Sequence, residues 1–535
     1  MSSPHPTDRA KWLAPQEMLF LGAVILAWAA LVLVLGKDTS WDFRNYHWYI
    51  PYAYLNHRMG FDVAVAHQAT YYNPTLDIPF YLLASHVPAW LALGILGAVQ
   101  GCNVIPLYLI ARATLQGEQK KLIAGILTLL CMTGGLTLNL AGTTYYDNVL
   151  SILTLTGLAV LVTNRETLAH GSLWQGVWIA LGAGFITGLA VGLKLPQGIF
   201  AMGFAGALLA TRGDTSHRMS RLVAGGIGGV IGFALMSAHW WVAMYHATGN
   251  PLFPYFNQYF GSPLALNASY RDLRFVPTTW PHRLLFPLLF TLDWRVADDL
   301  GYQDIRVCLA YVLSLATIPI LLLVKRKREP LVDPSAAATL FGFAGFTYLF
   351  WIGMFAIYRY ILALEMLAPV LVTCAVGLWP LSRRTQLIVL GTLGVVAVAC
   401  TRPEWIERAP VDDPYVQVQV PKIPHPNHTM VLMAGEAPMG YLIPSLPHQI
   451  PILRIDGWMI TPEDGSRLTA ATKNRVHKFK GDIYLIAEEY EIGRAAEALA
   501  DYGLQMRYPD CQEITANLGG PYKFCPVERL TDKTP

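Results

Sequence analysis

Charged side chains are scarce in this chain of 535 residues. Asp, Glu, Lys and Arg make up 14% of it, against about 25% in an ordinary soluble domain, whereas hydrophobic residues make up 54%. This shortage excludes an intrinsically disordered chain and a highly charged nucleic-acid-binding protein. The formal net charge of +3 is too small to indicate a charged partner, and we expect no nucleic acid among the partners.

Cysteine is also rare, with seven in the chain, which excludes a small scaffold stapled by disulfides. No Cys-x-x-Cys pair and no His/Cys spacing typical of a zinc site occurs. Five cysteines lie in or beside apolar segments and are most simply packing residues. The other two, Cys511 and Cys525, lie in the more polar C-terminal part and are the candidate disulfide, although sequence alone leaves their pairing open.

The shortage of charge is confined to one part of the chain. Residues 402–535 hold 32 of the 75 charged residues, which is 24% of that segment, whereas residues 1–401 hold 43, or 11%. A water-facing surface rarely tolerates the lower value. We therefore predict a transmembrane domain over 1–401 and a globular C-terminal domain over 402–535.

Membrane-spanning helices need about 20 mostly apolar residues each. The N-terminal part offers eleven segments of this kind, which predicts an α-helical polytopic membrane protein with about 11 transmembrane helices. The apolar stretch 75–88 is short for a span, and we expect a re-entrant or interfacial piece there. The expected spans are 17–36, 89–111, 121–139, 147–163, 176–193, 198–211, 222–244, 305–324, 335–355, 360–380 and 386–401.

Loop charges indicate which way the chain crosses the membrane. Lys and Arg are roughly three times as dense in the loops on the side of the N-terminus as in those on the other side, which fits a cytoplasmic N-terminus under the positive-inside rule. An odd number of spans then puts residues 402–535 outside. We expect a multi-pass protein of the bacterial inner (cytoplasmic) membrane with a periplasmic C-terminal domain and outer loops at 37–88 and 245–303.

Short strand-like and helix-like segments alternate in the C-terminal domain, which predicts a small α/β domain. Expected strands are 429–435, 451–457, 482–488 and 522–528, and expected helices are 466–479 and 491–503. Its residues form no recognisable catalytic pattern. The long outer loop 245–303 is rich in Pro, aromatic residues and Arg, so we expect short interfacial helices in it that line a lipid entrance.

Acidic residues of the transmembrane part fall mostly on the outer side, the opposite of the basic ones. Ionisable groups near a bilayer are costly and tend to mark sites or pathways. The densest group is "GKDTSWDFRNYHWYIPYAYLNHR" (36–58), where Asp42 and Tyr46 have the spacing of one helix face. Two more polar, aromatic turns follow, "TYYNPTLD" (70–77) and "GTTYYDN" (142–148). An aromatic belt with a solvated acid is the simpler interpretation of one such loop, but three together favour a site.

The architecture of the whole chain resembles that of the GT-C superfamily of membrane glycosyltransferases: a short inner tail, a first span, an outer loop that begins with acids, many further spans and a C-terminal outer domain. Within it, "WDFRNYHWYIPYAYLNHRMG" (41–60) is similar to the D-x-x-x-Y-H pattern of bacterial, mannosyltransferase-like members of undefined specificity. "TGNPLFPYFNQYFGSP" (248–263) is similar to a stretch that recurs in them. The resemblance implies an inverting enzyme that moves a sugar from a polyprenyl-phosphate-linked donor to an acceptor hydroxyl on the outer face, without a nucleotide.

Roles for individual residues also follow from the resemblance. The family's first-loop acid matches Asp42 best, as a general base that takes the acceptor's proton, while Asp38, nearer the membrane, is the rival. Arginine suits bidentate binding of phosphate, so Arg359 is the first candidate for the donor phosphate, followed by Arg283 and Lys194. Candidate substrate-binding residues are Tyr46, His47, Tyr72, Asn73 and Asp147.

Two other classes of function stay open. A lipid-linked oligosaccharide polymerase or ligase also acts on lipid-linked glycans and uses arginines of an outer loop. A transporter or flippase for such glycans is less favoured, because the chain shows no internal repeat and its acids lie at the outer boundary rather than at the bilayer midplane. The sequence identifies neither the sugar nor the acceptor, which is a lipid, a glycan or a protein. It establishes no cofactor, and the neighbouring acids Asp298 and Asp299 leave a divalent cation open.

Overall fold

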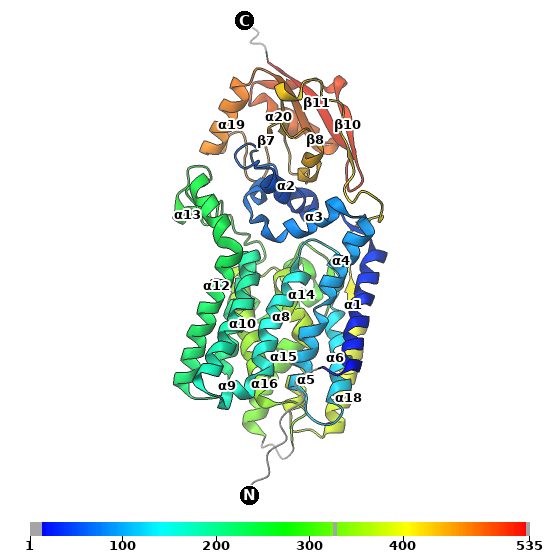
Figure 1. The fold of residues 1–535 in the computed structure, drawn as a ribbon, viewed down its shortest axis with the longest axis vertical. Helices are drawn as coiled ribbons and strands as arrows, with labels where there is room; N and C mark the ends of the chain where they lie inside the picture. The colour runs from blue at the N-terminus through cyan, green and yellow to red at the C-terminus, as the bar shows by residue number, and fades with distance from the viewer. Residues whose placement is uncertain (1–12, 325–328, 531–535) are drawn as a thin grey trace.

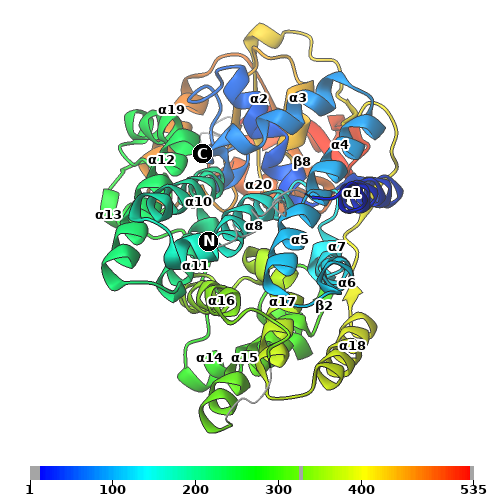
Figure 2. The same ribbon diagram turned by 60° about the horizontal axis from the view of Figure 1, so that its bottom comes forward.

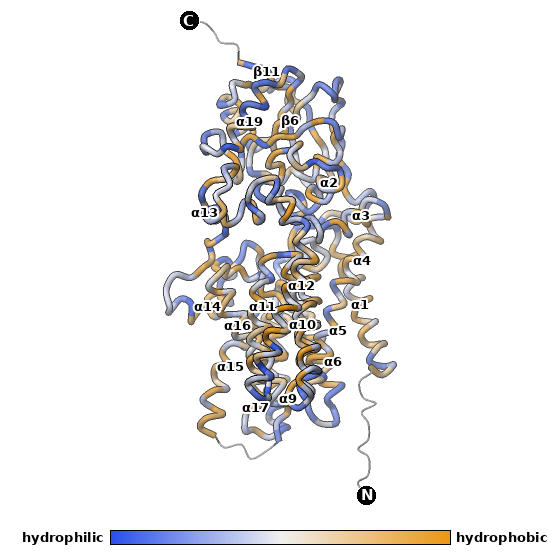
Figure 3. The backbone as a smooth tube through the Cα atoms, turned by 60° about the vertical axis from the view of Figure 1, so that its left-hand side comes forward, coloured by the Kyte–Doolittle hydropathy of each residue, from blue (hydrophilic) through white to orange (hydrophobic). Residues whose placement is uncertain are grey.

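The computed structural model describes residues 13–324 and 329–530. A helical bundle and a smaller sheet domain are stacked end to end, with the C-terminal part of the chain at one end (Figure 1). Apolar residues run through the helices of the bundle, whereas polar residues are frequent in the sheet domain (Figure 3). The last helix of the bundle ends at Ala399, and the first strand of the large sheet begins at Val418.

Each predicted span coincides with helical structure. The second span is two consecutive helices, and the third is a helix that ends at Met132 followed by the short helix α7 (Gly135–Asn139). Seven segments of the described chain are long and apolar enough to cross a bilayer. These are α1 (Pro15–Leu35), α4 (Ala89–Gly101) with α5 (Val104–Thr114), α10 (Leu173–Leu193), α12 (Thr215–Thr248), α15 (Arg306–Leu323), α16 (Pro334–Met354) and α17 (Leu362–Leu378) with the turn before it. They indicate a multi-pass membrane protein.

The remaining predicted spans are shorter helices of 13 to 17 residues. They are α6 (Lys120–Met132), α8 (Asp147–Thr163), α11 (Gly198–Ala210) and α18 (Arg383–Ala399). Length and composition thus identify seven segments of the described chain that can cross a bilayer, and the predicted count of eleven remains a prediction. Two further short helices, α7 (Gly135–Asn139) and α9 (Arg165–His170), lie between bundle helices in the sequence.

Helix α17 is the centre of the bundle. All of its residues are buried, whereas only 17% of the apolar window of α1 is buried. It packs against α5, α6, α8, α15, α16 and α18 (Figure 2). Because α17 is surrounded on all sides, a side chain at its first turn is held by the whole bundle rather than by one neighbour.

Glycines explain the close packing of α10 against α12. Gly184 and Gly188 are four residues apart on α10, and they lie against Gly225 and Gly229 of α12. A Cβ atom on Gly184 would be 2.1 Å from the carbonyl oxygen of Gly225, and one on Gly188 would be 2.1 Å from that of Gly229. Small residues at this spacing let two helix backbones approach each other in a membrane.

The C-terminal domain contains a mixed seven-stranded sheet in the order β5-β10-β11-β8-β6-β7, with β9 paired to β11. Strand β6 is parallel to both β7 and β8, while β11 is antiparallel to β8. The strands are β5 (Val418–Gln419), β6 (Thr429–Met433), β7 (Ile452–Arg454), β8 (Asp482–Glu488), β9 (Leu504–Met506), β10 (Gln512–Ala516) and β11 (Tyr522–Arg529). Helices α19 (Arg467–Lys478) and α20 (Ile492–Ala500) accompany them.

The predicted elements of this domain are present. Each of the four expected strands contains a strand of the sheet, and both expected helices form. Strands β5, β9 and β10 were not predicted, because they are short or carry no alternating apolar pattern. Cys511 and Cys525, the candidate pair whose bonding the sequence left open, form a disulfide that joins the residue before β10 to β11.

The first outer loop, 37–88, lies between the bundle and the sheet domain, where its helices α2 (Tyr49–Leu55) and α3 (Ile78–His86) separate the two (Figure 1). Val63 pairs with β7 at the edge of the sheet. The backbone N–H of Val63 donates to the carbonyl oxygen of Ile452 at 2.9 Å, and the backbone N–H of Arg454 donates to the carbonyl oxygen of Val63 at 2.9 Å. The stretch predicted as a short interfacial piece forms α3, a helix separate from the next span.

Two small ribbons and two short helices complete the outer region. The strands β1 (Lys37–Asp38) and β2 (Tyr302–Gln303) pair with β4 (Arg408–Ala409) and β3 (Arg402–Pro403) of the linker to the sheet domain. The second outer loop, 245–303, contains α13 (Asn257–Phe260) and α14 (Trp280–Leu292), as expected of a loop with short helices. The linker is therefore fastened to the outer ends of the bundle at two places.

The glycine contact gives a prediction about stability. Gly188→Ala would push a Cβ atom against the backbone of α12 and should lower the free energy of unfolding by about 1–3 kcal/mol. Gly182→Ala is the matched control, because a Cβ at Gly182 of the same helix has nothing within 4 Å. Thermal unfolding of the purified protein in detergent measures both. Equal midpoints for the two variants would contradict close backbone packing of α10 and α12.

Candidate functional site

The carboxylate of Asp42 is held by a cation and a hydroxyl at the outer end of the bundle. Nη1 of Arg359 donates to Oδ2 of Asp42 at 3.2 Å, and the hydroxyl of Tyr46 donates to the same oxygen at 2.9 Å. Asp42 precedes the turn η2 (Phe43–His47), and Arg359 lies in the turn η7 (Tyr358–Ile361) before α17. Both side chains remain 17% exposed. Within the described residues Oδ1 of Asp42 has no hydrogen-bond partner, so one carboxylate oxygen is left to meet a ligand.

A second ion pair lies beside the first. Nζ of Lys194 donates to both carboxylate oxygens of Asp147, at 2.9 and 3.0 Å, and to the carbonyl oxygen of Tyr145 at 2.9 Å. Nε of Arg359 is 3.9 Å from Oδ2 of Asp147. The four groups therefore alternate in sign, from Asp42 through Arg359 and Asp147 to Lys194. Alternation offsets the cost of taking four charges largely out of water.

Aromatic rings enclose these charges. The guanidinium of Arg359 lies 4.4 Å from the ring centre of Tyr145 and 5.6 Å from that of Tyr360, and the ammonium of Lys194 lies 5.7 Å from the latter. On the other side Tyr72 meets Tyr46 edge to face at 5.5 Å. Such rings attract cations through their electron-rich faces and keep water away.

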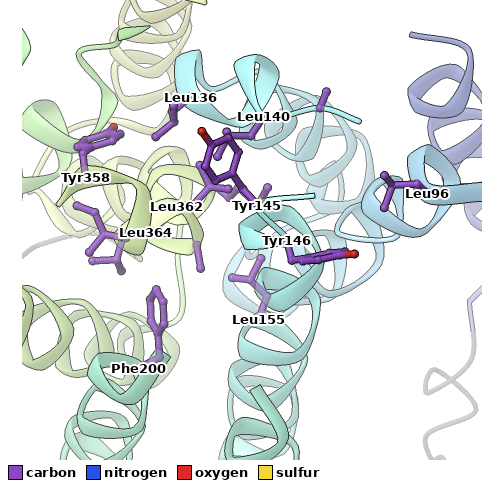
Figure 4. Packing of buried hydrophobic residues seen from close by; sticks show 14 of the residues in the cluster. Leu96, Leu136, Leu140, Tyr145, Tyr146, Leu155, Phe200, Tyr358, Leu362 and Leu364 are labelled. Atoms are coloured by element: carbon purple, nitrogen blue, oxygen red, sulfur yellow. The ribbon is translucent and has the colours of Figure 1, made fainter. Parts of the chain in front are cut away.

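The turn that carries Asp147 rests on the hydrophobic core. Tyr145 and Tyr146 lie among Leu136, Leu140, Leu155 and Leu362 (Figure 4). Tyr146 has a φ of 61°, in the left-handed region that side-chain-bearing residues rarely adopt. It is the residue before α8, so this strained turn sets Asp147 at the helix start, where the helix dipole favours an acid.

Asp38 and Asp42 have different roles in the structure. The side chain of Asp38 is fully buried, and its oxygens accept from Ser40 N at 2.8 Å, Thr144 N at 2.7 Å and Thr144 Oγ1 at 2.9 Å. These bonds tie the end of the first span to the turn before α8. Between the two acids that the sequence left open, the geometry thus favours Asp42 as the group that can meet a substrate.

His47 and Asp77 form a buried pair of their own, with Nδ1 of His47 at 2.5 Å from Oδ1 of Asp77. Burial lowers the pKa of His47 well below its usual value and raises the pKa of Asp77 well above its own. Lys194 and Arg359 lower the pKa of His47 further. The imidazole of His47 also packs on the ring of Tyr46, with 4.0 Å between ring centres, so it helps to position the tyrosine that bonds to Asp42.

Two of the predicted site residues lie outside this arrangement. Arg283 donates to the carbonyl oxygen of Pro277 at 2.9 Å and packs on the ring of Trp280 at the start of α14. The amide of Asn73 donates to the carbonyl oxygens of Gly192 and Met236, so it fastens the first outer loop to α10 and α12. Among the described residues neither side chain contacts the two ion pairs.

Four further residues of the site had no predicted role beside Asp42. Tyr145 lies two residues before Asp147, Tyr360 follows Arg359, and the hydroxyl of Tyr255 is 2.5 Å from that of Tyr72. The fourth is Asp298, which was considered only as a cation ligand. Asp298 is buried, and its Oδ2 accepts from the backbone N–H of Arg359 at 2.6 Å. Burial raises the pKa of Asp298 to about 6. The sequence did not indicate this contact with Arg359, because two adjacent acids in a long loop are usually exposed to solvent.

A metal site would need several ligands in one place. In the part of the chain that the structure describes, no group of three or more His, Cys, Asp or Glu side chains is placed to hold a metal ion. Asp298 is committed to the backbone around Arg359, and Asp299 forms an ion pair with Arg274 at 2.7 Å. The two acids that left a cation open therefore have protein partners.

Comparison with known proteins does not assign the chain to a family. No family model, no curated protein sequence and no solved structure matches the chain. The likeness to the GT-C superfamily rests on the architecture and the short motifs alone. Function must be argued from the chemistry of the site.

The ion pair of Lys194 with Asp147 gives a prediction. Lys194→Met leaves a carboxylate buried without its main partner and should cost about 3 kcal/mol of stability. The double variant Lys194→Met with Asp147→Asn should recover most of that loss, since the charge is removed with its partner. Thermal unfolding in detergent tests this. A double variant as unstable as the single one would show that the lysine acts through packing instead.

Proposed function

We propose that the protein is a membrane glycosyltransferase of the GT-C type. It transfers a sugar from a polyprenyl-phosphate-linked donor to an acceptor hydroxyl at the outer face of the bacterial inner membrane, with inversion at the sugar. The observation that carries the proposal is the partly exposed carboxylate of Asp42 beside the cation Arg359, with the ion pair of Lys194 and Asp147 next to them. A base next to cations suits a reaction in which a proton is taken up while a phosphate departs.

The topology belongs to the same proposal. All eleven predicted spans cross the membrane, with the shorter helices α6, α8, α11 and α18 completing the seven long ones. The N-terminus is cytoplasmic and the sheet domain periplasmic. In support, the site and the sheet domain lie at the same end of the bundle, opposite the loops in which basic residues are densest (Figure 1).

In the proposed reaction the acceptor hydroxyl lies against Oδ1 of Asp42. The acceptor oxygen forms a bond to the anomeric carbon while the bond from that carbon to the phosphate oxygen breaks. The acceptor's proton goes to Asp42, and polyprenyl phosphate leaves with the bonding electron pair. Because one step replaces one bond by the other from the opposite side, the configuration of the sugar is inverted.

Arg359 and Lys194 stabilise the negative charge of the departing phosphate. A guanidinium has five N–H donors, and Asp42 occupies one of those of Arg359. Nε of Arg359 is buried and has no hydrogen-bond partner in the described structure. This leaves donors for a phosphate oxygen, and Asp298 holds the backbone from which they project. The tyrosines around the site exclude water, which would otherwise compete as acceptor.

Substitution of the base tests the chemistry. Asp42→Asn should reduce turnover at least about 100-fold, because an amide cannot take the proton. The assay supplies the reconstituted full-length protein with polyprenyl-phosphate monosaccharides and a cell-envelope extract as acceptor source, and it measures the polyprenyl phosphate released. Asp293→Asn is the control, since Asp293 also lies in the second outer loop but pairs with the exposed Arg295 instead of with a residue of the site.

The outcomes separate the alternatives. Full activity of Asp42→Asn would remove Asp42 from the mechanism. Turnover with diphosphate-linked oligosaccharides alone would identify a polymerase or ligase. Movement of the intact donor across the liposome membrane without release of polyprenyl phosphate would identify a flippase.

Binding of the spent donor tests the phosphate site separately. Arg359→Ala should weaken binding of polyprenyl phosphate by about 10-fold or more, the usual loss for a charge-assisted hydrogen bond. Arg283→Ala should bind like the unmodified protein, because Arg283 faces Pro277 and Trp280 instead. Equal losses for both arginines would place the phosphate elsewhere. Fluorescence titration with a labelled polyprenyl phosphate measures the dissociation constants.

A further inference from the structure

Three aromatic rings are stacked where the first outer loop meets the sheet domain. The indole of Trp458 lies 4.7 Å from that of Trp41 and 5.2 Å from the imidazole of His67, with interplanar angles of 19° and 27°. Trp41 and His67 are stacked at 6.0 Å. Trp458 is nevertheless 50% exposed, which is unusual for a large ring in an ordered stack. The stack therefore presents an indole surface to an incoming ligand.

Hydrogen bonds of His67 hold the three rings in place. It is fully buried, its Nδ1 accepts from the backbone N–H of Trp458 at 3.2 Å, and its Nε2 donates to the carbonyl oxygen of Glu436 at 3.3 Å. Burial lowers the pKa of His67 well below its usual value, so the ring is neutral, as these two bonds require. Gly457, with a φ of 154°, lets the backbone pass close to the imidazole, because a Cβ there would lie 2.5 Å from it. The rings are thus held in place before any ligand arrives.

Charged groups lie at the edge of the stack. Glu436 follows β6, Asp456 follows β7, and Arg494 of α20 donates to both, at 2.8 Å to Oε1 of Glu436 and at 2.6 Å to Oδ2 of Asp456. Hydrogen bonds from Arg494 and Trp458 hold the pKa of Glu436 below its usual range. The side chains of Glu436 and Arg494 are still 41% and 39% exposed. In open α/β sheets ligands bind at the carboxyl ends of parallel strands, which is where these loops lie.

The same edge excludes an anionic ligand. The backbone N–H groups of Glu436 and Ala437 could form an anion-binding turn after β6. They donate instead to the carboxylate of Glu491, at 2.8 and 3.0 Å. The turn after β6 is therefore occupied by the carboxylate of Glu491, and Arg494 is already paired with Glu436 and Asp456. This leaves neither group free to bind the phosphate of a nucleotide or a free phosphate. A neutral ligand with an apolar face and many hydroxyl groups fits both the indole and the charged rim.

We propose that Trp458, Trp41, Glu436 and Arg494 form a saccharide subsite that binds the acceptor. A pyranose ring offers this chemistry, since its C–H groups lie on the electron-rich face of an indole while its hydroxyls bond to charged groups at the rim. Trp41 is the residue before Asp42, so the two Cα atoms are about 3.8 Å apart. The backbone therefore connects the stack directly to the residue that carries the base. Taking the bound saccharide as the acceptor rests on the proposed function, and it selects a glycan rather than a protein.

Binding of a saccharide can be measured without transfer. Saturation-transfer difference NMR with the full-length protein in nanodiscs and a panel of neutral hexose oligosaccharides should show binding, with the strongest signals from C–H protons of one ring face. Trp458→Ala should weaken binding about 10-fold, and Glu436→Gln should weaken it to a similar extent. Trp458→Phe, which keeps a ring, should retain most of the affinity.

Matched controls separate this site from general effects. Trp405→Ala removes an equally exposed tryptophan, 48% exposed, in the linker between β3 and β4, and it should bind like the unmodified protein. If the protein binds the saccharides but transfers sugar from no lipid-linked donor, the proposed glycosyltransferase function is wrong while the saccharide subsite still stands. Absence of binding by the whole panel, equal losses in the Trp405 and Trp458 variants, or binding only of an acidic peptide would overturn the subsite.

Discussion

The ion pair between Arg359 and Asp42 joins the turn before the central, fully buried helix α17 to the first outer loop. Charges so far from water are tolerated only when they are paired. Asp147 and Lys194 extend the pairing, and Asp298 holds the backbone of Arg359. The strained turn before α8, the buried acids and the central position of α17 all serve to hold these groups at fixed distances. A site built in this way needs little rearrangement when a charged substrate enters.

The first outer loop connects the two parts of the molecule. Asp62 accepts from Arg58, Tyr49 and the backbone N–H of Ile452 in the sheet domain, and all of these contacts are buried. Arg454 of the sheet domain donates twice to the carbonyl oxygen of Val65. Since this loop also carries the carboxylate of the site, the sheet domain is fixed relative to it. The proposed reaction and the proposed saccharide subsite therefore share one rigid support.

Much of the fold could be predicted because it follows from local patterns. Long apolar runs locate helices, short apolar runs locate β6 and β8, and a polar outer compartment favours the disulfide of Cys511 with Cys525. Prediction was weaker for polar residues in loops. Asn73 and Arg283 have the right chemistry for a site, yet their side chains donate to backbone carbonyl oxygens, those of Gly192 and Met236 for Asn73 and that of Pro277 for Arg283. The sequence does not show whether a polar side chain faces a ligand or a distant stretch of backbone, because that depends on long-range packing.

By itself the sequence determined a charge-poor, multi-pass helical part followed by a small α/β domain, and a group of outer acids and arginines in which function was to be sought. Only the tertiary structure distinguishes the surroundings of Asp38 from those of Asp42, because Asp38 is buried and bonded to Thr144 whereas Asp42 is partly exposed beside Arg359. It also brought Trp41 to Trp458, more than four hundred residues away in the chain. Composition reports which solvent a segment prefers, whereas distances between side chains exist only once the chain has folded.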